Sequence, residues 1–426
     1  MTGYRDIEFC QIADDWGSAP LGREVEPPLL VMRNGLTVEQ NKEEGELRVT
    51  RIETVSDGFI AEDRVRFASG LSAEHVEKYR IRKGDILFSH INSDPHLGKT
   101  AIALKDYPDL LHGMNLLLLR ANKEILLPEF LHFLCCYYRV KGVFVKICSR
   151  SVNQSSINQA KLKALEIPLP PLPEQQKIAG VLGVVQRAME QQERLLTLTA
   201  ELKKALLHKL FAEGLRGEPQ KQTEIGPVPV SWEVVKLGSA VNFQTGKLNS
   251  NAAKPDGQFP FFTCSQETFW IDHYAFDTEA LLLSGNNAQG IYSVKHFKGK
   301  FNAYQRTYVI TLKDEDSLPY SFLHQALSRN LERLRMLSIG TSTKYLTMGV
   351  LQNLPIPKPE YDEAKSIGEK LQVVERKREY EAQKGALLTD LFRTLLHQLM
   401  AAQIRVHDLD LEGLLAQAVA EKDSKP

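Results

Sequence analysis

The stretch LKALEIPLPPLPEQQKI at residues 162–178 occurs twice, because LQNLPIPKPEYDEAKSI at residues 351–367 repeats it at an offset of 189 residues. The alignment runs without a gap over residues 162–211 and 351–400, with identical residues at 18 of the 50 positions. A repeat of only two copies with so long a period indicates a duplicated domain pair, since solenoids repeat every ~20–50 residues. The duplication therefore sets the architecture.

Each copy predicts an extended connector followed by a long helix. The proline-rich run IPLPPLPEQQ cannot be helix or central strand. A helix is expected to start right after it, because Pro173 stands at the entry, Glu174 lies in the first turn, and no proline follows until Pro219. Gly214 and Gly217 then end the helix, which gives a length of roughly 60 Å.

Apolar residues three and four apart predict that each helix packs along one long partner. The centre of the second copy, ERKREYEAQK, is more polar than that of the first. Two matched long helices in one chain favour an intramolecular antiparallel pair. The predicted stripe consists of Ile178, Val181, Val185, Ala188, Gln192, Leu195, Thr199, Leu202 and Leu206, and in the second copy of Leu371, Val374, Leu388, Leu391, Leu395 and Leu399.

The regions before the two helices also follow one plan. Leu21-Gly22 opens the first and Leu237-Gly238 the second, and residues 81–99 match 277–290 with Ser89 aligned on Ser284. Each region then has a predicted strand (116–120, 307–312), a predicted helix (128–138, 319–334) and a polar loop (149–159, 339–349). Strands and helices mix without βαβ alternation.

These patterns predict an α+β fold with two globular domains separated by two long antiparallel helices, which form an intramolecular coiled coil with pseudo-two-fold symmetry. The expected boundaries are residues 1–161 for the first domain, 162–216 for the first repeat, 217–350 for the second domain and 351–426 for the second repeat. No apolar run approaches the ~20 residues of a membrane span and the N-terminus lacks a signal-peptide pattern, so we expect a cytoplasmic protein. The five scattered cysteines are expected to be reduced thiols.

The formal net charge is zero, but the charges are unevenly distributed. Acidic residues are absent between Glu129 and Glu166, between Glu279 and Asp314, and from Arg333 to Pro359, while basic residues occur in each segment. A surface that faces phosphates excludes carboxylates, which repel the backbone of a nucleic acid. Any one segment could be a solvated positive face, but their presence in both halves favours DNA or RNA as a partner.

The sequence contains none of the common catalytic motifs. Walker A, GxGxxG, HExxH, GxSxG and EF-hand patterns are absent, as is the Asn/Asp-Pro-Pro-aromatic motif with which amino-methyltransferases hold a flipped base. Its closest approach, Asp94-Pro95-His96, is interpreted as a turn. His208 and His397 recur at equivalent helix positions, which favours shared packing over catalysis. We therefore expect no enzyme activity.

The run IPLPPLPEQQKIAGVL, the long helix after it, the segment IGPVPVSWEVVKLG that enters the second half, and the repeated plan resemble the specificity subunit of type I restriction-modification systems. The second copy departs from the motif, with Glu360 and Asp362 in place of prolines. The resemblance implies two target-recognition domains that each read one half of a bipartite, asymmetric double-stranded DNA sequence. It also implies that the helices set the gap and dock two DNA adenine methyltransferase subunits.

By the same resemblance this chain binds no cofactor, because S-adenosylmethionine, ATP and Mg²⁺ are expected on partner subunits. Whether one partner is a motor-nuclease (restriction) subunit stays open. The rival interpretations are a coiled-coil scaffold that binds only proteins and a stand-alone nuclease. Base readers need amide, guanidinium, ammonium or hydroxyl groups in loops. The candidates are His90, Asn92, Lys99, Arg150, Asn153 and Gln154 in the first domain, and Asn286, Asn287, Gln289, Lys298, Arg306, Thr343, Lys344 and Tyr345 in the second.

Overall fold

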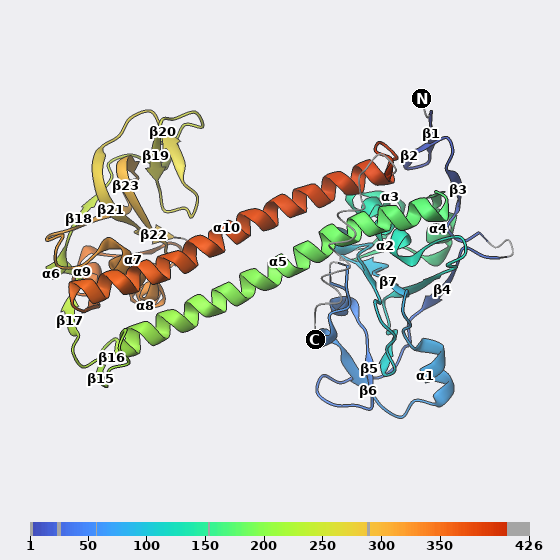
Figure 1. The fold of residues 1–426 in the computed structure, drawn as a ribbon, viewed down its shortest axis with the longest axis horizontal. Helices are drawn as coiled ribbons and strands as arrows, with labels where there is room; N and C mark the ends of the chain where they lie inside the picture. The colour runs from blue at the N-terminus through green and yellow to red at the C-terminus, as the bar shows by residue number, and fades with distance from the viewer. Residues whose placement is uncertain (1–2, 24–26, 57, 152–153, 288–289, 407–426) are drawn as a thin grey trace. The chain divides into compact units, whose positions relative to one another are not determined.

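The computed structural model describes residues 3–23, 27–56, 58–151, 154–287 and 290–406. The chain divides into two compact units, Met1–Gln192 with Lys384–Pro426 and Glu193–Gln383. Two long helices, α5 (Leu172–Glu213) and α10 (Tyr361–Met400), each contribute one part to each unit (Figure 1). The unit boundary thus falls inside both helices, and the predicted domain limits at residues 161, 216 and 350 stay a prediction. Within the described ranges no helix combines the length and apolarity of a membrane span.

The first unit is built on a four-stranded antiparallel sheet in the order β4–β11–β7–β9. Its side chains alternate between two faces, as the pleat requires. Phe88 and Leu117 lie in the main core with helix α2 (Pro128–Val140), whereas Leu87 lies in a second, smaller core. The sheet strands are β4 (Leu30–Asn34), β7 (Ile86–Phe88), β9 (Thr100–Ile102) and β11 (Leu117–Ala121).

Short elements surround this sheet. Strands β5, β6 and β10 form a three-stranded sheet over a small core, and β1 pairs with β2. The bounds are β1 (Tyr4–Ile7), β2 (Cys10–Ala13), β3 (Gly17–Pro20), β5 (Leu47–Val49), β6 (Arg66–Ala68), β8 (Ile91–Asn92), β10 (Leu110–Leu111), β12 (Ser149–Arg150), β13 (Ser155–Ser156), β14 (Glu166–Leu169), α1 (Ala73–Tyr79), α3 (Val143–Ile147), α4 (Gln159–Ala164), η1 (Ile52–Thr54), η2 (Glu62–Arg64) and η3 (Asp94–His96).

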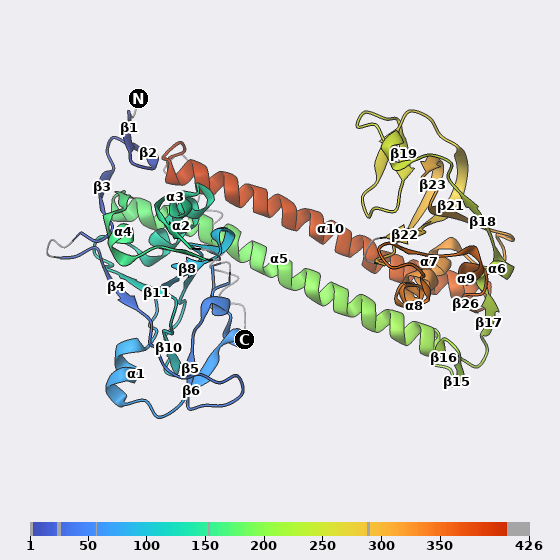
Figure 2. The same cartoon turned by 180° about the vertical axis from the view of Figure 1, so that it is seen from behind.

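The second unit contains a six-stranded sheet in the order β18–β24–β21–β23–β19–β20, whose strands are spread out in Figures 1 and 2. The sheet buries both faces at its centre. Leu281 and Ile310 belong to the core that also contains residues of helix α7 (Tyr320–Arg329), and Leu282 and Val309 belong to a second, aromatic core. The strands are β18 (Val241–Thr245), β19 (Phe259–Phe262), β20 (Phe269–Ile271), β21 (Phe276–Ser284), β23 (Val294–Ala303) and β24 (Thr307–Leu312).

The helix predicted over residues 319–334 is wrong as a single element. The structure has α7 (Tyr320–Arg329) and α8 (Leu331–Leu337), separated at Asn330, whose side-chain amide donates to the Ala326 carbonyl at 2.9 Å. This side-chain bond competes with continuation of the backbone ladder. The remaining elements are β15 (Gln220–Thr223), β16 (Gly226–Pro229), β17 (Glu233–Lys236), β22 (Asn286–Asn287), β25 (Lys344–Tyr345), β26 (Pro355–Lys358), α6 (Leu237–Ala240), α9 (Met348–Gln352) and η4 (Ser250–Ala252).

The proline-rich connectors are extended, as predicted. Strand β14 pairs only with β3, and β26 pairs only with β17. Proline fits such two-stranded ribbons because one side of the strand needs no N–H donor. Helix α5 begins at Leu172, beside the expected start, and Gly214 follows its end at a φ of 66°. The predicted connector and helix are therefore confirmed in both copies.

The helices pair antiparallel within each unit. In the second unit the Lys203 ammonium lies 2.7 Å from the Glu375 carboxylate, and the backbone N–H of Leu215 donates to Glu363 at 2.9 Å. Position therefore rises along α5 as it falls along α10. In the first unit Leu182 shares a core with Leu396. The antiparallel pair predicted from the repeat is confirmed.

The predicted seam of the helix pair is partly wrong. Leu195, Leu202 and Leu391 are 37%, 51% and 46% exposed, whereas Gln192 and Thr199 are buried. The predicted positions Ile178, Gln192 and Thr199 are confirmed as buried. The other half of the seam is shifted by one residue, because Leu196 and Lys203 are half-buried where Leu195 and Leu202 were predicted.

Candidate nucleic-acid interface

A small ribbon in each unit joins the two polar segments singled out from the sequence. In the first unit β8 pairs with β13, which pairs with β12, so that Asn92 lies opposite Ser155. In the second unit β22 pairs with β25, so that Asn287 lies opposite Lys344. We call β8–β13–β12 the first ribbon and β22–β25 the second ribbon. Segments predicted to be loops thus contain strands, since pairing satisfies their backbone hydrogen-bonding groups.

The two ribbons occupy equivalent places in their units. The N–H of Ile157 donates to the His90 carbonyl at 2.9 Å, and that of Leu346 donates to the Gly285 carbonyl at 2.8 Å. The residue that follows Ile157 or Leu346 caps a short helix. Asn158 accepts from the Lys161 N–H at the start of α4, and Thr347 accepts from the Val350 N–H at the start of α9. The backbone is therefore repeated, while the side chains differ.

Several polar side chains of the first ribbon are held by their neighbours. The Asn92 amide donates to the Ser89 hydroxyl at 3.1 Å and accepts from the Ser93 N–H at 2.9 Å. Arg150 lies 3.2 Å from Asp94, which also accepts from the Ser155 hydroxyl. These contacts shape the ribbon and use up much of the hydrogen-bonding capacity of Asn92.

The other first-unit candidates lie beside the same ribbon. His90 precedes β8, and burial lowers its pKa, so the imidazole is neutral at neutral pH and acts as a hydrogen-bonding group and not as a cation. Gln154 precedes β13 and is exposed, and Lys99 is half-buried in the segment just before β9. Asn153 lies outside the described residues.

The second ribbon gathers the second-unit candidates more tightly. Asn286 lies opposite the exposed Tyr345, and Asn287, whose amide oxygen accepts from the Ile291 N–H at 3.3 Å, lies opposite Lys344. Thr343 is exposed immediately before β25. The ribbon therefore presents amide, hydroxyl and ammonium groups side by side.

A recess of ≈ 230 Å³ lies at the base of the second ribbon. Arg306 and Tyr345 both line it, together with Gly285. Arg306 is exposed in the turn between β23 and β24. Its guanidinium carries five hydrogen-bond donors and no acceptor.

Lys298 is not brought to the second ribbon. It lies in β23 opposite Glu279 on β21, and its ammonium is 2.9 Å from that carboxylate. The hydrogen bond that Lys298 donates to Glu279 raises the pKa of Lys298. The Glu279–Lys298 pair lies four residues along the strand from the Leu283–Val294 pair near the end of β21. Four residues of a strand correspond to about 13 Å. Gln289 lies outside the described residues.

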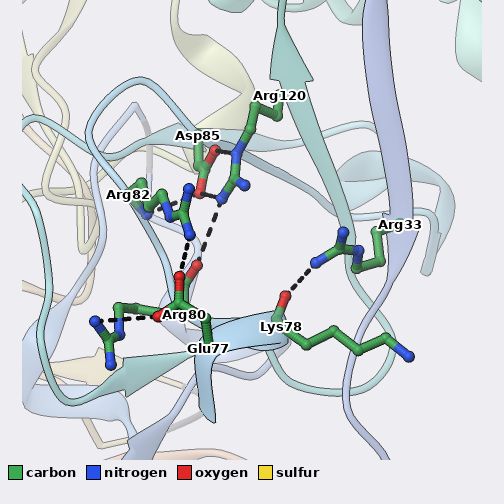
Figure 3. Close-up of polar contacts among 7 residues, drawn as sticks. All are labelled: Arg33, Glu77, Lys78, Arg80, Arg82, Asp85 and Arg120. Atoms are coloured by element: carbon green, nitrogen blue, oxygen red, sulfur yellow. Dashed lines mark hydrogen bonds and ion pairs between the residues drawn. The ribbon is translucent and has the colours of Figure 1, made fainter. Parts of the chain in front are cut away.

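A cluster of basic residues in the first unit was missed by the sequence analysis (Figure 3). The Asp85 carboxylate has a side-chain exposure of 1% and is 2.7 Å from both the Nε and the Nη2 atoms of Arg120. It also accepts from the Arg82 N–H at 2.8 Å. Glu77 pairs with Arg80 at 3.3 Å and with the Arg82 guanidinium.

The cluster carries more positive than negative charge. Its two carboxylates pair with Arg80, Arg82 and Arg120. Two more basic residues lie beside them, and there the Arg33 guanidinium on β4 donates to the backbone carbonyl of Lys78 on α1 (Figure 3). Such an arrangement attracts anions. No sequence pattern indicates it, because its members come from three separate segments that also contain acids. A pairing prediction for β4, β7 and β11 would have been needed to find it.

Exposed leucines occur at repeat-equivalent places on the two long helices. Leu198 and Leu202 of α5 are each 51% exposed, and Leu387 and Leu391 of α10, at the same two repeat positions, are 71% and 46% exposed. Residues four apart share one face of a helix. Each helix thus carries a matched apolar pair that no described part of its own unit covers. His208 and His397 are exposed, and His397 stacks on Tyr137 in the first unit.

No group of three His, Cys, Asp or Glu side chains among the residues that the structure describes is placed to hold a metal ion. The buried histidines are used in packing. His132 lies 3.0 Å from the Thr100 hydroxyl, and His112 donates through Nε2 to the Leu116 carbonyl.

Comparisons with known proteins give one consistent result. The family model described as "Type I restriction modification DNA specificity domain" matches residues 31–200 and 229–389. The chain is 32% identical over 418 residues to the putative type I restriction enzyme MjaX specificity subunit of Methanocaldococcus jannaschii, covering 95% of this chain and 97% of that one. It is 41% identical over 146 residues to the type I restriction enzyme EcoDI specificity subunit of Escherichia coli, covering 34% of this chain and 32% of that one.

The fold is also similar to that of a solved structure. The crystal structure of the type I restriction-modification S subunit from M. genitalium superposes with a TM-score of 0.67 at 18% identity, covering 90% of this chain and 96% of that one. At this identity the match supports the fold alone. The family model matches this chain twice, once before and once after residues 201–228. Two matches in one chain agree with the internal repeat.

Proposed function

The chain belongs to the specificity subunits of type I restriction-modification systems and contains two DNA specificity domains, and from that premise we propose how it reads DNA. Each ribbon enters one half of a bipartite double-stranded target. The observation that carries the proposal is that one backbone ribbon occurs at the same place in both units with different side chains. Equivalent frames dock in the same way on the two halves of a duplex, and different side chains read different bases.

The target is therefore bipartite and not palindromic. The first ribbon offers Gln154 as its most exposed amide, and the second offers Asn286 and Asn287 beside Lys344. Amides bond bidentately to adenine, and lysine bonds to guanine or to phosphate. The paired helices set the number of bases between the halves, because a helix lengthens by 1.5 Å per residue. The interpretation as a scaffold that binds only proteins is displaced, since the matched family model is a DNA specificity domain.

We further propose that the chain performs no chemistry of its own. As the specificity subunit it supplies recognition, while two DNA adenine methyltransferase subunits bind S-adenosylmethionine. In systems that also cleave, motor-nuclease subunits bind ATP and Mg²⁺. Incubation of the purified chain with DNA and Mg²⁺ tests this division, and cleavage by the chain alone would overturn it.

The matched leucine pairs are the proposed contact with the methyltransferase subunits. Two copies of one partner need two copies of one surface, and the pairs Leu198/Leu202 and Leu387/Leu391 supply it. Burying such leucines against an apolar helix contributes about 1.5–3 kcal/mol each. The complex of this chain with its methyltransferase should lose one copy in Leu198→Glu and one in Leu387→Glu, as measured by native mass spectrometry.

Leu195 provides the matched control for this experiment. It is 37% exposed on the same helix, but the repeat places Lys384 at the equivalent position, so the surface is not duplicated there. Leu195→Lys should keep two bound copies. If Leu195→Lys removes a copy while Leu198→Glu does not, the docking surface has been assigned to the wrong residues.

Base reading is tested by sequencing the methylated sites of cells that carry the chain and its methyltransferase. Gln154→Ala should relax a base in the first half-site and leave the second unchanged, and Asn287→Ala should do the reverse. Lys298→Ala should weaken binding to all sequences by a similar factor, because the ammonium carries charge but no base pattern. Equal loss on every sequence from Asn287→Ala would show that this residue does not read a base.

A further inference from the structure

The recess at the base of the second ribbon has the composition of a site for one base edge. Arg306, Gln305 and Thr245 line it with polar groups, and none of its lining residues is a carboxylate. Tyr308 forms one wall, and its hydroxyl donates to the Leu346 carbonyl at 2.9 Å, which fixes the ring. The recess volume of ≈ 230 Å³ leaves room for an edge of a nucleobase with water.

The hydrogen-bonding groups of the recess are unequally available. The side-chain N–H of Gln305 donates to Asn249 at 2.7 Å, which leaves its oxygen as an acceptor. The Arg306 side chain is exposed beside the recess. A planar fork of donors beside a lining without carboxylates is suited to two acceptors on one plane.

Gly285 is required for this arrangement. A Cβ atom at that position would lie 2.4 Å from the Arg306 carbonyl oxygen and 2.9 Å from the Tyr308 ring, distances that real Cβ atoms essentially never show. The N–H of Gly285 donates to the same Arg306 carbonyl at 2.8 Å. The glycine therefore lets the second ribbon approach the turn that carries Arg306 and holds the arginine backbone in place.

The first unit lacks this recess chemistry. His90 stands where the second unit has Gly285, as the matching bonds from Ile157 and Leu346 show. Strand pairing gives the matching position for Arg306. Leu117 lies opposite Phe88 in the first unit, and Tyr308 lies opposite Leu283 in the second, so Leu117 and Tyr308 are equivalent. Two residues before them stand Asn115 and Arg306. The two units therefore differ in which base contacts this place permits.

We propose that Arg306 reads a guanine in the second half-site through the major-groove edge, with its guanidinium donating to the O6 and N7 atoms. Guanine is the base that presents two acceptors side by side in that groove, and arginine is its commonest partner. The exposed ring of Tyr345, on the ribbon above the recess, bounds the entry. This inference rests on the proposed function, because it assumes that the second ribbon enters DNA.

The test uses the assembled complex of this chain with its methyltransferase subunits. Methylated-site sequencing of the wild-type complex first establishes a bipartite motif, and failure at this step would overturn the proposed function itself. Arg306→Ala should then lower the preference for guanine at one position of the second half-site by about 5- to 160-fold, the discrimination of one bidentate pair. Arg306→Lys should keep binding to DNA but also relax that position, because an ammonium has no fork.

The first half-site should stay unchanged in both variants, and Asn115→Ala should leave the second half-site unchanged. Two outcomes would overturn the inference while leaving the proposed function intact. One is an unaltered motif in Arg306→Ala. The other is an equal loss of affinity on every duplex together with a shallower salt dependence, which marks a phosphate contact.

Discussion

The contact between Glu174 and Arg405 should determine how firmly the end of α10 is held in the first unit. The Arg405 Nε and Nη2 atoms lie 2.8 and 2.9 Å from the two carboxylate oxygens of Glu174, and the Trp16 indole N–H donates to the same carboxylate at 3.0 Å. The Glu174 and Arg405 side chains are each 11% exposed. A second carboxylate, Asp15, also pairs with Arg405 at 2.8 Å but is 53% exposed.

Glu174→Gln keeps the size of the side chain and removes its charge. Breaking a buried ion pair costs about 3–5 kcal/mol. Because Arg405 keeps its contact with Asp15 in this variant, we expect a loss near the lower limit, about 3 kcal/mol. A loss of this size accelerates amide exchange about 100-fold, since a tenfold change corresponds to about 1.36 kcal/mol. The amides to follow are those of Ala401 and Gln403, which donate to carbonyls of α10.

Glu363 is the matched control, because it stands at the repeat position of Glu174. It accepts from the Trp232 indole at 3.1 Å and from the Leu215 N–H at 2.9 Å, both neutral donors. Glu363→Gln should therefore cost the second unit only about 1 kcal/mol, the net contribution of one hydrogen bond.

Hydrogen exchange measured by mass spectrometry on the full chain compares the two variants. A double-mutant cycle with Arg405→Met should give a coupling energy above about 1.5 kcal/mol between Glu174 and Arg405. Equal exchange in Glu174→Gln and Glu363→Gln, or a coupling energy near zero, would refute the reasoning that the ion pair holds this segment.

Acid should destabilise the first unit well above the range of carboxylate protonation. Burial lowers the pKa of His112 to about 3 and that of His132 to about 4, so the unfolded chain, with histidines near 6.5, binds more protons below that pH. Stability falls by about 3 kcal/mol between pH 6.5 and pH 5 for the two together, and His132→Leu should halve this slope in urea titrations. Asp85→Asn should destabilise the first unit by about 1.5–3 kcal/mol in the same titrations, because it removes the charge of a buried carboxylate that is hydrogen-bonded to Arg120; an unchanged urea midpoint would contradict this. Gly246→Ala should lower the melting temperature of the second unit, since the added Cβ would lie 1.7 Å from the Ala303 carbonyl oxygen, and calorimetry with an unchanged transition would disprove this packing.

Local signals made the helices and connectors predictable. The prolines between residues 167 and 173 exclude helix, Glu174 suits a first turn, and Gly214 ends the helix, and each of these effects acts within a few residues. The duplication added the number of domains and their order. The resemblance of the repeated motif to a known family then indicated DNA recognition before any geometry was known.

Tertiary structure decided where the candidate side chains meet. Asn287 and Lys344 lie 57 residues apart in the chain, and the two-residue strands that pair them carry no alternating apolar pattern that a sequence shows. Lys298 looked equivalent to them in the sequence, yet it pairs with Glu279 on the sheet. The pairing register, and not the residue type, separates these cases.

The sequence by itself thus determined the duplicated α+β plan, the extended connectors and the two long helices, because proline, glycine and helix periodicity act through local backbone geometry. Only the tertiary structure decided which face of each helix is buried and which polar residues share a ribbon. The physical reason is that the choice between neighbouring seam positions on a helix and the pairing of distant two-residue strands both depend on contacts with residues far away in the chain. Leu198 and Leu387, at matched positions and exposed, were identified only from the structure, and Arg306, a candidate from the sequence, was placed beside its recess by it.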